Sequence, residues 1–337
     1  MDIANFLKKG NELFERAEMI AHQDKQPFVP EHSGALLPWV YNGTHSRTAY
    51  IEVREGGLEF LAESDPFGTD AFVPDEDGRY IIPLIIPHFK QKKSLTPAMF
   101  EGVVAFGMEA LESVEGKRND FLGKMSRNHR LIWEVARMGA ITGRVLGPNG
   151  SIIRNWFNKL GSEGSPLVQT KKTVDWSSAK IRSALVDAKR LGEEKLGDKT
   201  ADGWVGICGK NVMDAINDNT SFEKSVERFN DGSLLRTDNR GGLILASDII
   251  VHEYARPTVA GINLIGPDDF YLCPKVDDMY NFAWGPGTGM SDLGSQGRPE
   301  YYTAEDLPHD GGVEIKGSTN PLAWVSDLEA IVKVEQE

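Results

Sequence analysis

The sequence predicts an α+β protein organised around one long helix, on three observations. Residues 117–146 contain no proline and repeat apolar or small side chains at steps of three and four, the spacing of one helix face. Residues 46–88 alternate like paired strands but contain few bulky apolar residues for a core of their own. Residues 172–290 alternate helical patterns with short apolar strands, which is typical of a compact α/β unit.

The first 45 residues are predicted to form an N-terminal arm. Residues 2–22 have the pattern of an amphipathic helix, with these residues near one face: Ile3, Phe6, Leu7, Leu13, Phe14, Ala17 and Ile20. Pro27 and Pro30 end that pattern, and residues 27–45 are predicted to be extended. An amphipathic helix at a terminus has to bury its apolar face, and a partner subunit is one candidate for covering it.

Residues 46–96 are predicted to form an extended loop built as an antiparallel ribbon. Ala49–Val53 and Leu58–Ala62 alternate on either side of a glycine pair, which is a hairpin signal. Residues 80–87, YIIPLIIP, hold two prolines that cannot donate to a ladder, so they belong at an edge or in a crossover. A long ribbon of this kind projects from a domain and typically holds a neighbour. We therefore predict intersubunit contacts at four residues of the loop: Arg54, Gly56, Gly57 and Leu58.

Residues 117–146 are predicted to be a spine helix about 45 Å long, against which a flat element lies. Asn119 is the predicted N-cap, and Gly147-Pro148 the stop signal. The predicted buried stripe consists of Leu122, Met125, His129, Ile132, Ala136, Gly139 and Gly143. The charged residues predicted to lie mostly off it are Lys124, Arg127, Arg130, Glu134 and Arg137. The glycines predict a close backbone approach by a crossing β-sheet.

The rest of the chain is predicted to contain short elements. Arg144–Leu146 and Ile152–Arg154 are predicted to form a tight hairpin with its turn at residues 147–150, and residues 174–192 are predicted to form an amphipathic helix. The predicted buried strands and short helix are Trp204–Cys208, Leu243–Val251, Phe270–Cys273 and the helix Val212–Ile216. Two closing strands, Gly312–Lys316 and Glu329–Glu335, are expected to return to the sheet beside the spine.

Composition excludes several classes of protein. The net charge of −13 argues against sequence-independent nucleic-acid binding, which needs a basic stripe. Cys208 and Cys273 build no disulfide framework and are predicted to be buried thiols. Apolar runs are too short to span a membrane, and charged residues interrupt the N-terminal apolar pattern, so we expect a protein made in a cytoplasm.

The sequence contains no recognisable set of catalytic residues. Gly285–Gly289 lacks the lysine and hydroxyl residue of a phosphate loop, and Ser291 lies outside a nucleophile elbow. His252-Glu253 has no second histidine at metal-protease spacing. His129 is predicted to be a hydrogen-bonded core or interface histidine. We therefore expect no enzyme activity, no metal and no cofactor.

Several ordered stretches resemble a known family. They are YIIPLIIPHFKQKKSLTP at 80–97, the hairpin at 144–153 followed by VQTKKTVDW at 168–176, LIGPDDFYLCP at 264–274, and GRPEYYTAEDLPHDGGVEIKGSTNP at 297–321. This order resembles the HK97-like coat-protein fold of tailed bacteriophages and, more narrowly, the major capsid protein family of phage lambda (major capsid protein E). The resemblance runs from about residue 46 to residue 337, and the first 45 residues match only in general character.

The resemblance implies a structural subunit that self-assembles as hexamers and pentamers into an icosahedral shell around a dsDNA genome. It implies a peripheral domain at 97–171 and 291–337, with the spine helix, and an axial domain at 172–290. It also implies a scaffold protein, a portal, a decoration protein in some relatives, DNA packaged without sequence specificity, no membrane, and a virion assembled in the host cytoplasm. Three alternatives remain: an encapsulin-type compartment shell with the same fold, an enzyme with a site near 284–300, and a tail or baseplate protein.

Overall fold

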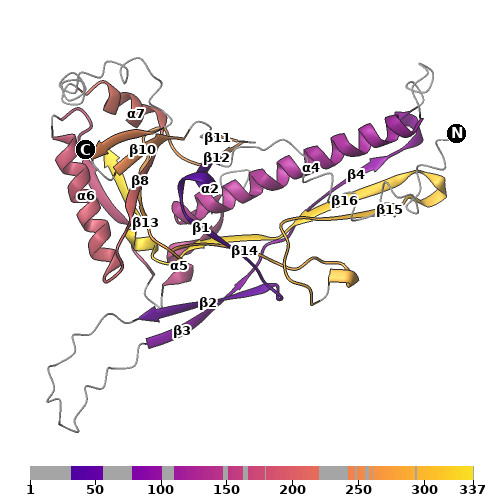
Figure 1. Cartoon of the computed structure of the whole chain (residues 1–337), viewed down its shortest axis with the longest axis horizontal. Helices are drawn as coiled ribbons and strands as arrows, with labels where there is room; N and C mark the ends of the chain where they lie inside the picture. The colour runs from indigo at the N-terminus through magenta and orange to yellow at the C-terminus, as the bar shows by residue number, and fades with distance from the viewer. Residues whose placement is uncertain are drawn as a thin grey trace, which may run out of the picture.

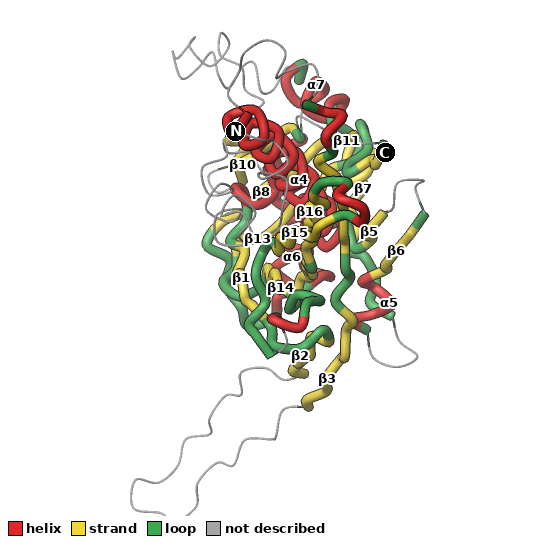
Figure 2. Tube along the Cα trace, turned by 90° about the vertical axis from the view of Figure 1, so that its right-hand side faces the viewer, coloured by secondary structure: helices red, strands yellow, loops and turns green. Residues whose placement is uncertain are grey.

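The computed structural model describes residues 32–55, 78–100, 110–146, 151–161, 166–178, 180–219, 242–246, 249–254, 258–259, 261–292 and 294–336, and the fold is given for these. Figure 1 shows a long helix, α4, with a compact unit of strands and helices at one end and a thin sheet running beneath it. The two-stranded ribbon β2–β3 leaves the body on the side of that sheet away from α4, and Figure 2 shows the same from a second direction. The predicted α+β architecture with a spine helix is confirmed.

The spine helix α4 spans Ala110–Ile141, so it begins and ends earlier than predicted. Asn119 is not its N-cap: it lies inside the helix, where its Oδ1 accepts hydrogen bonds from Arg118. The helix ends before Gly143, whose φ of +74° is a left-handed value that breaks the helix. A Cβ on Gly143 would overlap the Phe157 ring, so glycine is required there for space as well.

A hairpin follows the helix, as predicted, and it makes the expected close approach. Strand β5 (Arg144–Leu146) pairs with β6 (Ile152–Asn155), and α5 (Trp156–Leu160) comes next. Gly139 lies against β5, because a Cβ there would be 2.8 Å from Val145 Cγ2. Because Gly139 has no side chain, β5 can pack directly against the backbone of the spine helix.

The compact unit is a six-stranded sheet in the order β7-β18-β13-β8-β10-β9. Its strands are β7 (Thr170–Val174), β8 (Gly203–Cys208), β9 (Leu243–Ala246), β10 (Ile249–Glu253), β13 (Phe270–Lys275) and β18 (Val332–Gln336). Helices α6 (Ile181–Leu196) and α7 (Lys210–Asn217) accompany it. Leu185 and Ala188 of α6 are fully buried, as its amphipathic pattern predicts. Cys208 and Cys273 are free and buried, and burial raises the pKa of Cys208 to about 12.

Two predicted strands in this unit are corrected. The last strand was expected beside the spine, but β18 pairs with β13 and with β7 in the six-stranded sheet. Its alternate residues Val332 and Val334 are fully buried there, which gives the strand its place. Leu243–Val251 is not one strand: β9 and β10 form an antiparallel pair.

Two three-stranded sheets lie along the spine. The first has the order β1-β14-β17, with β1 (Trp39–Gly43), β14 (Tyr280–Trp284) and β17 (Pro321–Val325). The second has the order β15-β16-β4, with β15 (Tyr301–Asp306), β16 (Val313–Thr319) and β4 (Phe89–Leu95). Trp133 of α4 joins them, because its Nε1 donates to Thr319 Oγ1 at 2.9 Å and its ring lies 4.8 Å from that of Trp284.

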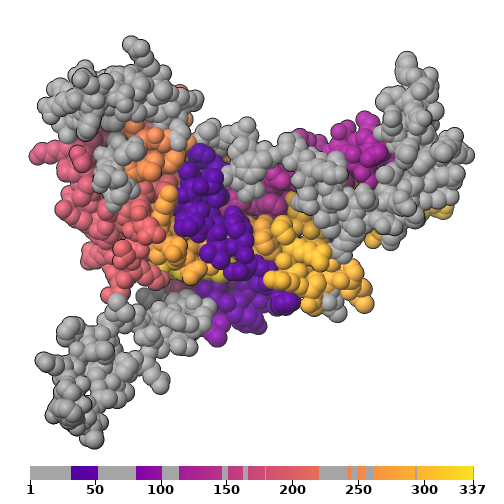
Figure 3. All heavy atoms as spheres, viewed as in Figure 1, coloured from indigo at the N-terminus to yellow at the C-terminus, as the bar shows by residue number. Residues whose placement is uncertain are grey.

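The end of the N-terminal arm is packed on the body and is not extended throughout, contrary to prediction. Residues His32–Leu36 form α2, and β1 pairs in parallel with β14. In Figure 3, residues 32–43 form an indigo band over this face of the molecule. The predicted helix at 2–22 lies outside the described residues. The remaining short elements are β11 (Thr258–Val259), β12 (Ile262–Asn263) and the 3-10 turns Pro97–Met99, Met290–Asp292, Pro308–Asp310 and Leu328–Ala330.

Candidate functional site

The ribbon presents an apolar face that nothing in the described chain covers. Strand β2 (Thr48–Glu55) pairs antiparallel with β3 (Gly78–Ile85), from Thr48 opposite Ile85 to Glu55 opposite Gly78. Because side chains alternate, Ala49, Ile51 and Leu84 are buried on the body side. The opposite side, here called the outer ribbon face, carries Tyr50, Ile81, Pro83 and Ile85. Tyr50 is 69% exposed, Ile81 64% and Ile85 75%.

Residues 80–87 carry a sequence signal for this face that the predicted contact residues do not include. In YIIPLIIP, apolar residues occupy both the odd and the even positions, so both faces of the strand are apolar. This pattern is typical of a strand that is covered on both sides. One side meets the body of this chain. The other therefore indicates a covering element outside the described residues.

Of the four predicted contact residues, the structure describes the backbone of Arg54 alone. Arg54 is on β2, opposite Arg79 of β3. Gly56, Gly57 and Leu58 lie outside the described residues, so their contacts stay a prediction. The strand partner of Ala49–Val53 is β3, and not the predicted Leu58–Ala62, which also lies outside the described residues.

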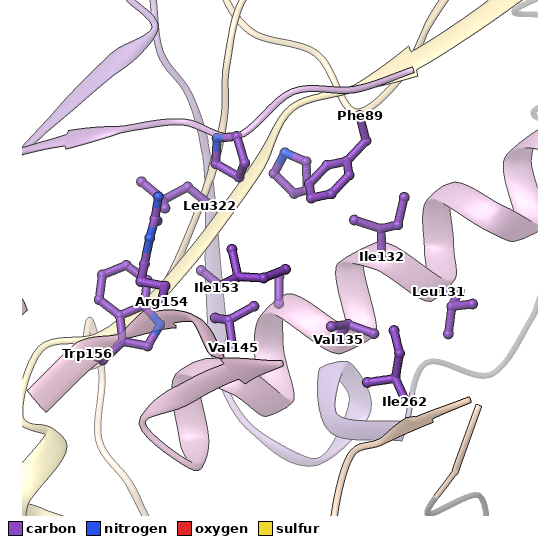
Figure 4. A pocket seen from close by; sticks show the side chains of 14 residues that line it. Phe89, Leu131, Ile132, Val135, Val145, Ile153, Arg154, Trp156, Ile262 and Leu322 are labelled. Carbon is purple, nitrogen blue, oxygen red and sulfur yellow. The ribbon is translucent and has the colours of Figure 1, made fainter. Parts of the chain in front are cut away.

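An apolar groove opens beside the spine, where the chain that leaves the ribbon passes α4 (Figure 4). It has a volume of about 270 Å³, and we call it the spine groove. Its residues come from five parts of the fold: Pro87 and Phe89 beside the ribbon, Leu131, Ile132, Val135 and Ala136 of α4, Val145, Ile153, Arg154 and Trp156 of the hairpin and α5, Ile262 of β12, and Pro321, Leu322 and Ala323 of β17. Arg154 is the one charged residue in this lining.

Arg154 fastens the ribbon base to the hairpin. Its Nη2 donates to the carbonyl oxygen of Ile85 at 2.8 Å, and its guanidinium lies 5.0 Å from the centre of the Trp156 ring. Figure 4 shows the two side chains together at one end of the groove. Burial lowers the pKa of Arg154, because the charged form is partly removed from water.

A buried charged network holds the arm to the spine. Glu134 accepts hydrogen bonds from the backbone nitrogen and the Oγ of Ser33, both at 2.9 Å, and from the Tyr254 hydroxyl at 2.6 Å. Arg137 Nη1 lies 3.0 Å from Glu134 Oε2. Burial, with the Glu134 charge beside it, raises the pKa of Tyr254, so this hydroxyl remains a donor. The network joins α2, α4 and the loop after β10.

Glu134 and Arg137 were predicted to lie off the buried stripe, and this prediction is wrong. Both are buried, because α2 and β14 cover the side of α4 that the periodicity assigned to solvent. The helix periodicity shows where a charged residue lies on the helix. It does not show whether a distant segment of the chain covers that residue and supplies it with a partner. Among the stripe residues, Leu122, Met125 and His129 are buried as predicted.

His129 belongs to a second buried polar cluster, between α4 and the sheet β15-β16-β4. Its Nδ1 lies 3.3 Å from Glu300 Oε1, and the Tyr302 hydroxyl donates to Glu300 Oε2 at 2.6 Å. Burial, reinforced by the Glu300 charge, raises the pKa of Tyr302. His129 is thus buried in the core, as predicted, but neither of its ring nitrogens makes the expected hydrogen bond with the described residues.

Hydrogen bonds from other segments hold the glycine-rich loop at 284–300 to the body of the protein. Asn320 Nδ2 donates to the carbonyl oxygen of Pro286 at 2.7 Å, and Thr44 donates to that of Trp284. In the part of the chain that the structure describes, no group of three His, Cys, Asp or Glu side chains could hold a metal ion. None of the described helices is long and apolar enough to cross a membrane.

The spine helix, the projecting ribbon and the compact sheet unit define a class: the HK97-like coat proteins that form phage shells. The sequence matches the family described as phage major capsid protein E over residues 15–336. The chain belongs to this family, and it is a phage major capsid protein, a component of the virion.

Solved structures agree on the fold. A prophage capsid protein from E. coli CFT073 is 12% identical, with a TM-score of 0.54, over 96% of this chain and 99% of that one. The mature capsid of bacteriophage PhiM1 contains a chain that is 9% identical, with a TM-score of 0.52, over 93% of this chain and 89% of that one. No curated protein sequence matches the chain.

Proposed function

We propose that copies of this protein assemble as hexamers and pentamers into an icosahedral shell, and that the outer ribbon face lies on a neighbouring subunit. The observation that supports this is the exposed row of Tyr50, Ile81 and Ile85 on a ribbon of two strands. A two-stranded ribbon is marginally stable alone in water, so a partner that buries this row stabilises it.

The division of the chain follows from the same proposal. Residues 172–290 are the axial domain at the capsomer centre, residues 97–171 and 291–337 the peripheral domain, residues 46–96 the extended loop and residues 1–45 the arm. The six-stranded sheet adds β18 to the axial part and β14 lies with the spine, so these two strands cross the proposed boundaries.

The partners proposed are a scaffold protein, a portal, a decoration protein and dsDNA held without sequence specificity. Assembly takes place in the host cytoplasm, and the subunit has no catalytic role. The net charge of −13 supports this proposal, because an acidic shell repels the packaged DNA and keeps it from adhering to the wall.

The test is a variant with Tyr50→Ser and Ile81→Lys, expressed with the scaffold and examined by electron microscopy and gel filtration. We expect soluble subunits and a yield of shells at least tenfold lower, because the variant places a charge in the buried contact. The matched control is Val168→Lys, since Val168 is 72% exposed and its backbone nitrogen donates to Glu329, which precedes β18 of the six-stranded sheet. Normal shells from the ribbon variant would contradict the proposed contact. Shells that form equally well without a scaffold would favour a compartment shell.

A further inference from the structure

The spine groove needs an occupant with an apolar surface and one negative charge. All its lining residues except Arg154 are apolar or aromatic. The half-buried Arg154 guanidinium donates a hydrogen bond to the Ile85 carbonyl and lies over the Trp156 ring. Among the described residues it has no carboxylate partner. A partly buried cation without a counter-charge is unfavourable, so the groove selects for an anion beside the apolar contact.

One segment of this chain fits that requirement. Residues 11–22, NELFERAEMIAH, contain three glutamates and one arginine. On a helix, Leu13, Phe14, Ala17 and Ile20 share a face. Glu18 follows Phe14 by four residues, so it lies next to Phe14 at the edge of that face. The segment therefore offers an apolar stripe with a carboxylate along one side.

The chain between this segment and the body is long enough to reach the groove. The structure holds Ser33 against Glu134, on one side of α4. By the helix periodicity, the groove residue Ile132 lies on the side of α4 opposite Glu134, and Val135 lies about a quarter of a turn from Glu134. Residues 23–31 can span about 30 Å when extended. A helix with its side chains is about 10–12 Å across, so the tether can pass around α4.

We propose that residues 11–22 bind as a helix in the spine groove of their own chain, with the apolar face on α4 and Glu18 paired with Arg154. The short tether gives the segment a high effective concentration at its own groove, so this contact forms in a single subunit. The inference does not depend on shell assembly.

Cross-linking in the full-length chain tests the placement. The variant carries Phe14→Cys and Val135→Cys, and it is treated with a short bis-maleimide at a concentration where gel filtration shows single subunits. Cys208 and Cys273 are both fully buried and stay out of the reaction. We expect a link within one chain, at monomer mass, between the peptides that contain positions 14 and 135. Absence of a link, or a link only in dimers, would overturn the proposal.

Two further variants complete the experiment. If Val135→Cys does not fold, Ile153→Cys replaces it, because Ile153 lies in the same groove and is 59% exposed. The pair Phe14→Cys with Arg182→Cys is the control, since Arg182 is exposed on α6, and it should give no link.

Charge reversal tests the role of Arg154. Arg154→Glu should lower the yield of the link between positions 14 and 135 several-fold, because two carboxylates would then face each other. Adding Glu18→Arg should restore the yield, which a purely structural effect of the Arg154 change would not do. Arg182→Glu, with the same change of charge on α6, should leave the yield unaltered. A loss without restoration would contradict the pairing.

Discussion

Glu134 is the central side chain of the buried network that holds the N-terminal arm to the spine helix. It is buried, it accepts three hydrogen bonds from Ser33 and Tyr254, and it is paired with Arg137. Removing one partner of a buried ion pair leaves the other charge without compensation. The energetic effect of Glu134 therefore depends on Arg137.

We predict that Glu134→Ala lowers the free energy of unfolding of the unassembled subunit by about 3–5 kcal/mol. The double variant Glu134→Ala with Arg137→Met should recover part of this loss, because no unpaired charge remains. Urea denaturation measures both. Glu193→Ala is the control, since Glu193 makes a surface pair with Lys189 whose loss costs about 0.3–0.5 kcal/mol. Equal effects at positions 134 and 193 would show that burial does not govern this network.

The glycines at the end of α4 determine where the spine stops. Gly143 has a positive φ, and the Phe157 ring occupies the space of its missing side chain. The spine thus ends through tertiary contact with α5 as well as through backbone conformation. Gly294 has the same φ of +74°, but nothing lies within 4 Å of a Cβ built there.

We predict that Gly143→Ala is more destabilising than Gly294→Ala. Both variants acquire the left-handed strain, about 1–2 kcal/mol. Only Gly143→Ala adds a clash with an aromatic ring, about 1–3 kcal/mol more. Thermal unfolding of the two variants gives the comparison. Similar midpoints would mean that Phe157 moves away freely.

Local patterns predicted the elements better than their ends and partners. The spacing of Leu122, Met125 and His129 revealed the spine, because burial repeats with the helix period. Asn119 failed as a cap because any exposed polar residue in a helix satisfies the same pattern. The sheet assignment of β18 depends on β7 and β13, which are distant in the chain, and alternation alone does not identify a strand's partner.

For the molecule as a whole, the resemblance of ordered motifs predicted the fold class and the family, and the match over residues 15–336 confirms the family. The outer ribbon face was not predicted residue by residue. Ala49, Ile51 and Leu84 face the body, so the opposite side of the ribbon is the one that the described residues leave exposed, and no local pattern predicts which side that is. The contacts of one copy with another are not encoded in any single local pattern.

We predict that Gly56→Val with Gly57→Val impairs shell assembly but leaves the subunit folded. Gly56 and Gly57 directly follow Glu55, where β2 ends opposite Gly78. Replacing both with valine removes conformational freedom from the chain as it leaves the ladder, since β-branched residues are stiff and avoid positive φ. The buried base of the ribbon is untouched, so subunits should remain soluble and folded.

Electron microscopy of lysates should show a large loss of closed shells, and gel filtration should show subunits. Gly116→Val is the control, because a Cβ at this helical position meets nothing within 4 Å. If the double variant forms shells at normal yield, the ribbon tip is not an arm between subunits. In that case the outer ribbon face, tested separately through Tyr50 and Ile81, would have to hold the neighbour without it.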